Sequence, residues 1–164
     1  MWRYTLSPGG PALLFTDPVL AMFGRYRQLS PVAKESGGQL FAQFKGAATI
    51  LQEATAPRLL DVRRRNAFIP ARRAQQREIR ERYAIGLHFV GDWHTHPEPI
   101  PQPSRKDIQS MMDCFTRSRH DLRAFIMVIA GTDPTPEGLY VAMVDRKSVK
   151  QLIWNGADQP LRIA

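Results

Sequence analysis

Apolar residues recur at helical spacing in two stretches of the chain. The first stretch follows Thr16-Asp17-Pro18, a polar residue, an acid and a proline of the kind that begins a helix. The second follows Ser104, which is also a common helix cap. The apolar positions of the two stretches are Val19, Met22, Phe23 and Tyr26, and Ile108, Met111, Met112 and Phe115. Their spacing predicts two amphipathic helices, the second over residues 104–119.

Shorter runs alternate between apolar and polar residues or are uniformly apolar, as strands are. Residues 39–44 and 48–54 flank Lys45-Gly46 and predict a β-hairpin. Residues 57–70 predict a strand or a loop, and residues 71–83 favour a helix that Gly86 ends. The remaining strands are expected at residues 2–6, 87–94, 124–130, 139–145 and 148–154.

Length and composition agree with one domain over residues 1–164. A chain of 164 residues with 43% hydrophobic content can bury a core without disulfide bonds. The order of the expected elements predicts an α/β (or α+β) fold, in which helices flank a mixed β-sheet.

Three features indicate a cytoplasmic protein without a membrane partner. Cys114 is the single cysteine, so an internal disulfide framework is excluded and a reducing compartment fits. The longest apolar run, residues 124–130, is far shorter than the roughly 20 residues that span a bilayer. The first ten residues lack the apolar segment and the cleavage site of a secretion signal.

Positive charge is concentrated in the segment from Arg58 to Arg82. The formal net charge of the chain is +8, and this Arg-rich segment contains nine arginines and three acidic residues. Such a segment can contact an acidic protein or a nucleic acid, and it can equally be the solvated face of a surface helix. No recognisable nucleic-acid-binding motif accompanies the arginines, so nucleic acid is disfavoured as a partner.

The most specific chemical pattern is His94-Thr95-His96, followed after seven residues by Ser104 and Asp107. In an extended segment, residues i and i+2 point to the same side, so both imidazoles can reach one metal ion. Asp107, in the first turn of the expected helix, can be a third ligand, and catalytic zinc usually takes three protein ligands. The intervening loop, residues 97–103, contains four prolines that restrict its backbone.

These residues also have a purely structural explanation. Ser-x-x-Asp ahead of an apolar helix is typical of a capping box, in which the Ser104 oxygen accepts the amide of Asp107. His88 and His120 stand outside any metal-binding pattern and are interpreted as structural. Trp93 is expected in the core, and Cys114 is expected to be a buried or half-buried residue, not a nucleophile.

A metal-dependent hydrolase also needs a group that transfers protons, and three glutamates are candidates. Glu53 lies inside a strand pattern and is expected on the solvated surface. Glu98 faces the same side as His96 in an extended chain, although it stands between prolines. Glu35 stands at a turn that leads into a strand, and the two glycines after Ser36 permit close backbone approach. Glu35 is therefore the first candidate and Glu98 the second.

Together, Glu35, the His94-Thr95-His96 triplet and Ser104-x-x-Asp107 resemble the signature of the JAB1/MPN+ (JAMM) metalloproteases. The order of elements from about residue 6 to residue 153 also resembles the mixed sheet of that family. The resemblance implies that His94, His96 and Asp107 bind Zn²⁺. It further implies that Glu35 takes a proton from water and later protonates the leaving amine, and that Ser104 donates to the developing oxyanion.

The same resemblance implies a substrate class. It predicts a zinc-dependent peptidase or isopeptidase that cleaves at the C-terminus of a ubiquitin-like protein or of a conjugated tail. In its small size the chain resembles the deconjugating peptidases encoded beside bacterial E1/E2-like enzymes, including those of cGAS-like antiphage operons. The implied partners are therefore a conjugated protein and, in the same pathway, E1/E2-like enzymes. An extended tail is expected to add as a strand to an exposed sheet edge.

Other functions fit less well. A metallo-β-lactamase-like site requires an aspartate and a histidine at two positions that Glu98 and Pro99 occupy here. A non-catalytic interaction module of the same fold is expected to lack metal ligands, and all of them are present. Nucleic-acid binding through the Arg-rich segment can coexist with catalysis.

Overall fold

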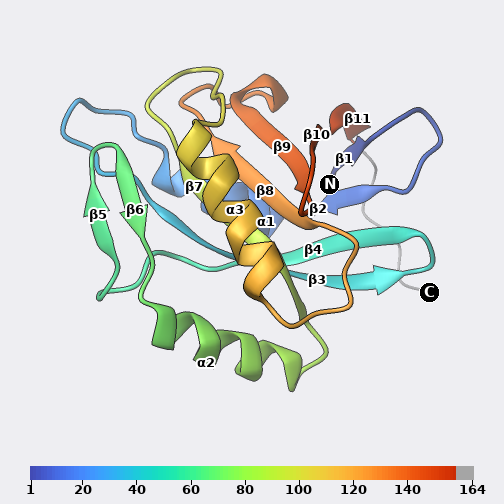
Figure 1. The fold of residues 1–164 in the computed structure, drawn as a ribbon. Coiled ribbons are helices and arrows are strands. Elements are labelled where there is room, and N and C mark those ends of the chain that lie inside the picture. Colours follow the sequence, from blue (N-terminus) through green and yellow to red (C-terminus); the bar gives the residue numbers. More distant parts are fainter. Residues whose placement is uncertain (158–164) are drawn as a thin grey trace.

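A nine-stranded mixed sheet forms the body of the protein (Figure 1). A computed structural model describes residues 1–157, and the remainder of the expected domain lies outside the described residues. The strands of the sheet are β1 (Trp2–Thr5), β2 (Leu13–Phe15), β3 (Gly37–Lys45), β4 (Ala48–Ala54), β7 (His88–Thr95), β8 (Phe125–Ala130), β9 (Leu139–Val144), β10 (Val149–Gln151) and β11 (Ile153–Ala157). Their spatial order is β10-β9-β8-β7-β3-β4-β2-β1-β11.

The expected mixed sheet with flanking helices is confirmed. Two neighbouring strand pairs, β2–β4 and β7–β8, are parallel, and the other pairs are antiparallel. The helices are α1 (Asp17–Tyr26), α2 (Arg72–Tyr83) and α3 (Arg105–Arg117), with a short 3-10 helix at Pro136–Gly138. None of the helices in residues 1–157 is long and apolar enough to cross a bilayer.

The strand expected at residues 148–154 is wrong as a single element. It divides at Leu152 into β10 and β11, which lie at opposite ends of the sheet. The Leu152 side chain is buried, and its amide donates to the carbonyl of Val141 at 2.8 Å. Because one residue joins the two outermost strands, the sheet must curl until its edges approach each other. An alternating pattern alone does not distinguish one strand from two that meet at a bend.

Two apolar clusters pack against the two sides of the sheet. The larger cluster includes Phe23 of α1, Trp93 of β7 and Leu152, and the smaller one includes Met111 and Phe115 of α3. Trp93 is 1% exposed, as expected for a core residue, and its indole nitrogen donates to the carbonyl of Thr55 at 3.0 Å. The apolar faces from which α1 and α3 were predicted therefore pack against the sheet.

A glycine sets the packing of the strand that carries the histidines. Gly91 of β7 has φ +151, and a Cβ at this position would lie 1.9 Å from the carbonyl oxygen of Ile126 on β8. Only glycine accommodates both the backbone conformation and this approach. The register that places His94 beside Ile129 depends on it.

The Arg-rich segment forms a hairpin and a helix, and it partly faces the protein. Residues 57–70, expected to be a strand or a loop, contain the two-stranded hairpin β5 (Val62–Arg64) and β6 (Ala67–Ile69). The expected helix follows as α2, along the lower side of the molecule in Figure 1. Arg82 of α2 pairs with Glu53 at 2.7 Å, so Glu53 is half-buried and paired, which corrects its expected place on the solvated surface.

Arg58 anchors this segment to the sheet. Its side chain is 10% exposed and donates to Glu78 of α2 at 2.8 Å and to Gln39 of β3 at 3.0 Å. Its backbone amide donates to Asp61, whose second carboxylate oxygen accepts the amide of Ala71 just before α2. The guanidinium thus joins a sheet strand, a loop and a helix, and it compensates two carboxylates that are largely removed from water.

Arg58→Ala is expected to destabilise the protein by about 3–5 kcal/mol, because Asp61 and Glu78 lose their cation while they stay buried. Urea denaturation followed by circular dichroism measures this change. Arg73→Ala removes the same charge from an exposed position of α2 and is expected to change stability by less than about 0.5 kcal/mol. Equal effects of the two substitutions would show that Arg58 is not a structural anchor.

Candidate active site and metal centre

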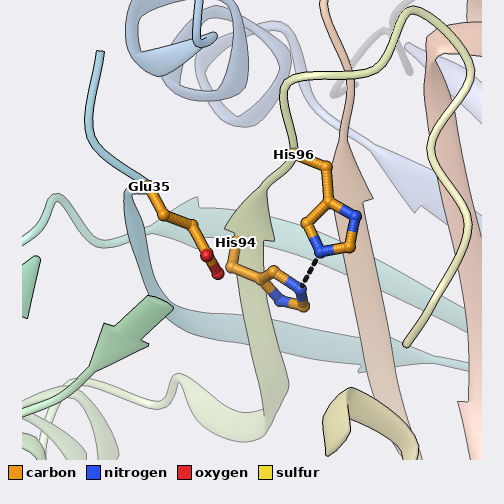
Figure 2. Close-up of side chains that lie close together, drawn as sticks. All are labelled: Glu35, His94 and His96. Carbon is orange, nitrogen blue, oxygen red and sulfur yellow. Dashed lines mark hydrogen bonds between the residues drawn. The ribbon is translucent and has the colours of Figure 1, made fainter. Parts of the chain in front are cut away.

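His94 and His96 come together where β7 ends. His94 belongs to β7, and His96 follows it by two residues, so both rings lie on one side of the strand (Figure 2). Their Nε2 atoms are 3.2 Å apart. Thr95 points to the opposite side and is fully buried, as the alternation predicts.

The Asp107 carboxylate lies against both histidine rings. Its Oδ1 is 3.5 Å from Nε2 of His94, and its Oδ2 is 3.4 Å from Nε2 of His96. Ser104 is the N-cap of α3, where its Oγ accepts the Asp107 amide at 3.1 Å and its amide donates to Asp107 Oδ2 at 2.7 Å. The capping box is therefore real, and the carboxylate that closes it also faces both histidines.

The spacing of these donors fits a tetrahedral metal ion. Ligands at about 2.0–2.1 Å from a tetrahedral zinc ion are about 3.3–3.4 Å from one another. The two Nε2 atoms are 3.2 Å apart, and each lies 3.4–3.5 Å from a different oxygen of the Asp107 carboxylate. Two imidazoles and a carboxylate are donors that Zn²⁺ accepts, so the residues present fit this ion in chemistry and in approximate spacing.

Glu35 lies beside the histidines although some sixty residues separate them in the sequence. Its carboxylate and the ligand nitrogens of His94 and His96 all lie within 4.8 Å of one another, and Figure 2 shows the carboxylate directed toward His94. The β3–β7 ladder explains this proximity, because Gly37 is the register partner of His94. Glu35, two residues before Gly37, is thereby brought to the end of β7 that carries the histidines.

The two glycines after Ser36 permit the close approach that the sequence suggested. A Cβ on Gly37 would lie 2.6 Å from the carbonyl oxygen of Trp93, and a Cβ on Gly38 would lie 2.0 Å from that of Thr55. Any larger residue would push β3 away from its neighbours. These glycines therefore keep Glu35 within reach of the histidines.

Two buried polar residues that sequence reasoning missed, Thr95 and Gln28, form hydrogen bonds that hold the segment next to Glu35. Thr95 Oγ accepts the amide of Ser36 at 3.0 Å and donates to Gln28 Oε1 at 3.1 Å. Gln28 is buried, and its Nε2 donates to the carbonyls of Ala33 and Arg65 at 3.2 and 2.9 Å. The hydroxyl between the two histidines was the available signal for Thr95. Gln28 had none, because its partners are distant in sequence.

The proline-rich loop is held against the loop that follows β8. The carbonyl of Glu98 accepts the amide of Thr132 at 2.9 Å, and that of Pro99 accepts the amide of Asp133 at 3.3 Å. Glu98 itself is 57% exposed, and its Oε2 is 3.4 Å from Nδ1 of His96. It therefore faces the nitrogen of His96 that points away from His94 and Asp107.

The pKa values of Glu35, Asp107 and His96 are shifted in different directions by their surroundings. Burial raises the pKa of Glu35, although the nearby histidines act in the opposite direction. Burial also acts to raise the pKa of Asp107, but hydrogen bonds from His94 and His96 outweigh it and hold this pKa well below its usual range. For His96, burial acts to lower the pKa, and Asp107 and Glu98 more than compensate, so its pKa is raised.

The other histidines lie apart from this cluster. His120 Nε2 donates to the carbonyl of Phe115 at 2.9 Å, and its Nδ1 accepts the amide of Leu122 at 3.2 Å. His88 stands at the opposite end of β7, where its ring contacts Phe44 and Tyr83. Both arrangements agree with the structural interpretation of these residues.

Residues 31–144 match the family described as "Prokaryotic homologs of the JAB domain". The match covers more than half of the chain and includes every member of the cluster. The chain belongs to this family. The nine-stranded mixed sheet and its helices are thus a JAB/MPN fold.

Two similar proteins are both named "CD-NTase/cGAS isopeptidase". The one from Pseudomonas aeruginosa (strain BWHPSA011 / Pa011) is 30% identical over 135 residues, which cover 80% of this chain and 82% of that protein. The one from Enterobacter hormaechei subsp. hoffmannii (strain UCI 50) is 30% identical over 102 residues, which cover 61% of this chain and 57% of that protein. The chain therefore matches little more than half the length of the second relative.

A solved structure supports the same fold. The solution structure of a Desulfitobacterium hafniense protein superimposes with a TM-score of 0.58 at 17% sequence identity. The match covers 85% of this chain and 88% of that protein. At this identity the likeness concerns the fold alone.

We expect chelator-treated protein to bind one divalent metal ion per chain, with an affinity that falls from about pH 8 to about pH 6. Metal ligands must be deprotonated, Asp107 stays ionised over this range, and the raised pKa of His96 lets protons compete with the metal for this residue. Affinity should therefore rise with pH and level off above that pKa. Isothermal titration calorimetry measures it.

Matched histidine variants serve as the control for this prediction. His94→Ala should abolish binding of the metal, whereas His88→Ala, at the other end of β7, should leave it unchanged. An affinity that stays constant across this pH range would contradict histidine ligation.

Proposed function

We propose that the protein is a zinc-dependent peptidase or isopeptidase. It cleaves at the C-terminus of a ubiquitin-like protein or of a ubiquitin-like conjugated tail. The observation that carries this proposal is the convergence of Glu35, His94, His96 and Asp107 from three separate segments at one point. Membership of the JAB domain family supports it, and so does the isopeptidase name of two relatives.

In this proposal each clustered residue has a separate task. His94, His96 and Asp107 hold the zinc ion, which when bound supplies a Lewis acid for the substrate carbonyl and lowers the pKa of water. Glu35 accepts a proton from the attacking water at its carboxylate and then transfers it to the leaving amine. A partly desolvated carboxylate suits this task, because burial raises its pKa toward the operating pH.

Ser104 is suited to stabilise the negative charge that develops on the substrate carbonyl oxygen. Its Oγ already accepts the Asp107 amide, so the hydroxyl proton stays available for donation. The residue is exposed at the start of α3, where a substrate can reach it. Ser104 caps α3, and Asp107 belongs to its first turn. The distance between the Ser104 hydroxyl and the Asp107 carboxylate is therefore fixed by the helix.

The proposed partners follow from the relatives and from the substrate class. The substrate is a conjugated protein with an extended tail that adds to an exposed sheet edge. E1/E2-like enzymes are proposed for the same pathway. With Cys114 as the single cysteine, a reducing cytoplasm is the compartment that we propose.

The alternatives are weaker for structural reasons. An inactive interaction module has no need for the converging donors, and the donors are in contact. Nucleic-acid binding by the Arg-rich segment loses support because Arg58 and Arg82 bind carboxylates of the protein itself. Exposed arginines on α2 still allow such binding beside catalysis.

Glu35→Gln is expected to lower kcat for cleavage of a ubiquitin-like protein fused at its C-terminus by about 10²–10⁴-fold, because the proton acceptor is lost. The variant should keep one zinc per chain in elemental analysis, since Glu35 is not one of the three ligands. His94→Ala should lose both zinc and cleavage. If Glu35→Gln cleaves as fast as the wild type while Glu98→Gln does not, the base is Glu98.

Ser104→Ala should lower kcat by about 10²–10³-fold, because the developing oxyanion loses a donor. It should also cost about 0.5–2 kcal/mol of stability through the lost helix cap. Ser104→Thr keeps both the cap and the hydroxyl and is the matched control. Stopped-flow cleavage assays and thermal unfolding separate the two effects, and a kcat that follows stability alone would exclude a role of Ser104 in catalysis.

A further inference from the structure

Arg63, on strand β5 in the Arg-rich segment, contacts the backbone carbonyls of Lys34 and Glu35 and the side-chain hydroxyl of Ser36. Its Nε donates to the carbonyl of Glu35 at 3.0 Å. Its Nη2 donates to the Ser36 hydroxyl and, at 3.5 Å, to the carbonyl of Lys34. One guanidinium thus binds three consecutive residues centred on the proposed proton acceptor.

The segment that receives these contacts has no secondary structure of its own. Residues 33–36 lie between a turn and the start of β3 at Gly37. No helix or strand ladder determines the direction in which the Glu35 side chain leaves the backbone. Hydrogen bonds from elsewhere in the protein must therefore determine it.

Different residues hold different parts of this segment. Gln28 binds the carbonyl of Ala33, and Thr95 binds the amide and the carbonyl of Ser36. Glu35 itself is held by β5, because its amide donates to the carbonyl of Arg64 at 2.8 Å and its carbonyl accepts from Arg63. Only the second of these bonds depends on the identity of a side chain.

From these contacts we propose that Arg63 is a positioning residue that fixes Glu35 toward the two histidines. A planar guanidinium presents several N–H donors in a fixed geometry, so it can satisfy three acceptors that do not share one direction. Lysine has a point-like ammonium on a flexible chain and cannot reproduce that geometry. The catalytic consequence rests on the proposed function, whereas the restraint on residues 34–36 does not.

Two neighbouring arginines of β5 differ in their surroundings. Arg63 faces the protein, whereas the side chain of the next residue, Arg64, is exposed to solvent. Arg64→Ala removes the same charge from the same strand and leaves the backbone carbonyl in place. It is therefore a matched control for Arg63→Ala.

The first test is hydrogen exchange, which needs no substrate. Peptides that cover residues 33–37 should exchange about 10-fold faster in Arg63→Ala than in the wild type, and they should be unchanged in Arg64→Ala. In Arg63→Lys the exchange rate of these peptides should lie between the rates of the wild type and of Arg63→Ala. Elemental analysis should find one zinc per chain in all variants, because the metal ligands are not touched.

The second test is cleavage of the ubiquitin-like fusion. Arg63→Ala should lower kcat about 10–100-fold with KM within about twofold of the wild type, because a misplaced group affects the chemical step. In the Glu35→Gln background the same substitution should change kcat by less than about twofold, since Arg63 acts through Glu35. Arg63→Lys should restore part of the loss.

Two results would overturn the proposal. One is exchange of residues 33–37 that is the same in Arg63→Ala and Arg64→Ala. The other is a loss of kcat that is equally large with and without Glu35, which would mean that Arg63 acts elsewhere. If the wild-type protein cleaves no such fusion, the proposed function fails, and the exchange experiment still decides whether Arg63 restrains the segment.

Discussion

The pairing of β3 with β7 is the constraint on which the site depends. Gly37 is opposite His94 in this ladder, and that single register brings a glutamate from the first third of the chain to the histidines. A slip of one residue would turn His94 and His96 toward the core and Thr95 toward the site. The close contacts of Gly37, Gly38 and Gly91 with neighbouring backbone prevent such a slip, because no larger residue fits there.

Ser104 and Asp107 show how one local motif serves stability and chemistry together. The capping box begins α3, and its carboxylate is at the same time in contact with both histidines. The apolar face of α3 is buried through Met111 and Phe115, so the position of the helix start is set by core packing. A carboxylate that belongs to a packed helix moves less than one on a free loop, and this rigidity suits the proposed metal centre.

The Arg-rich segment illustrates why charge density is a poor guide to binding surfaces. Three of its arginines face inward: Arg58 ties α2 to the sheet, Arg82 pairs with Glu53, and Arg63 binds the backbone around Glu35. The other arginines of α2 are exposed to solvent. Whether an arginine is a structural tie or a surface charge depends on acceptors that are distant in sequence, so composition does not separate the two.

Local patterns in the sequence were sufficient for the helices, most strands and the group of side chains that converge at the candidate site. Apolar spacing predicted α1 and α3, and the His94-Thr95-His96 and Ser104-x-x-Asp107 motifs predicted which side chains meet, because both depend on periodicities of two and of about four residues. The tertiary structure alone decided the division at Leu152, the support by Gln28 and the direction of Arg63. These features arise where a curled sheet brings distant backbone groups into contact, and partners of that kind leave no periodic trace in the chain.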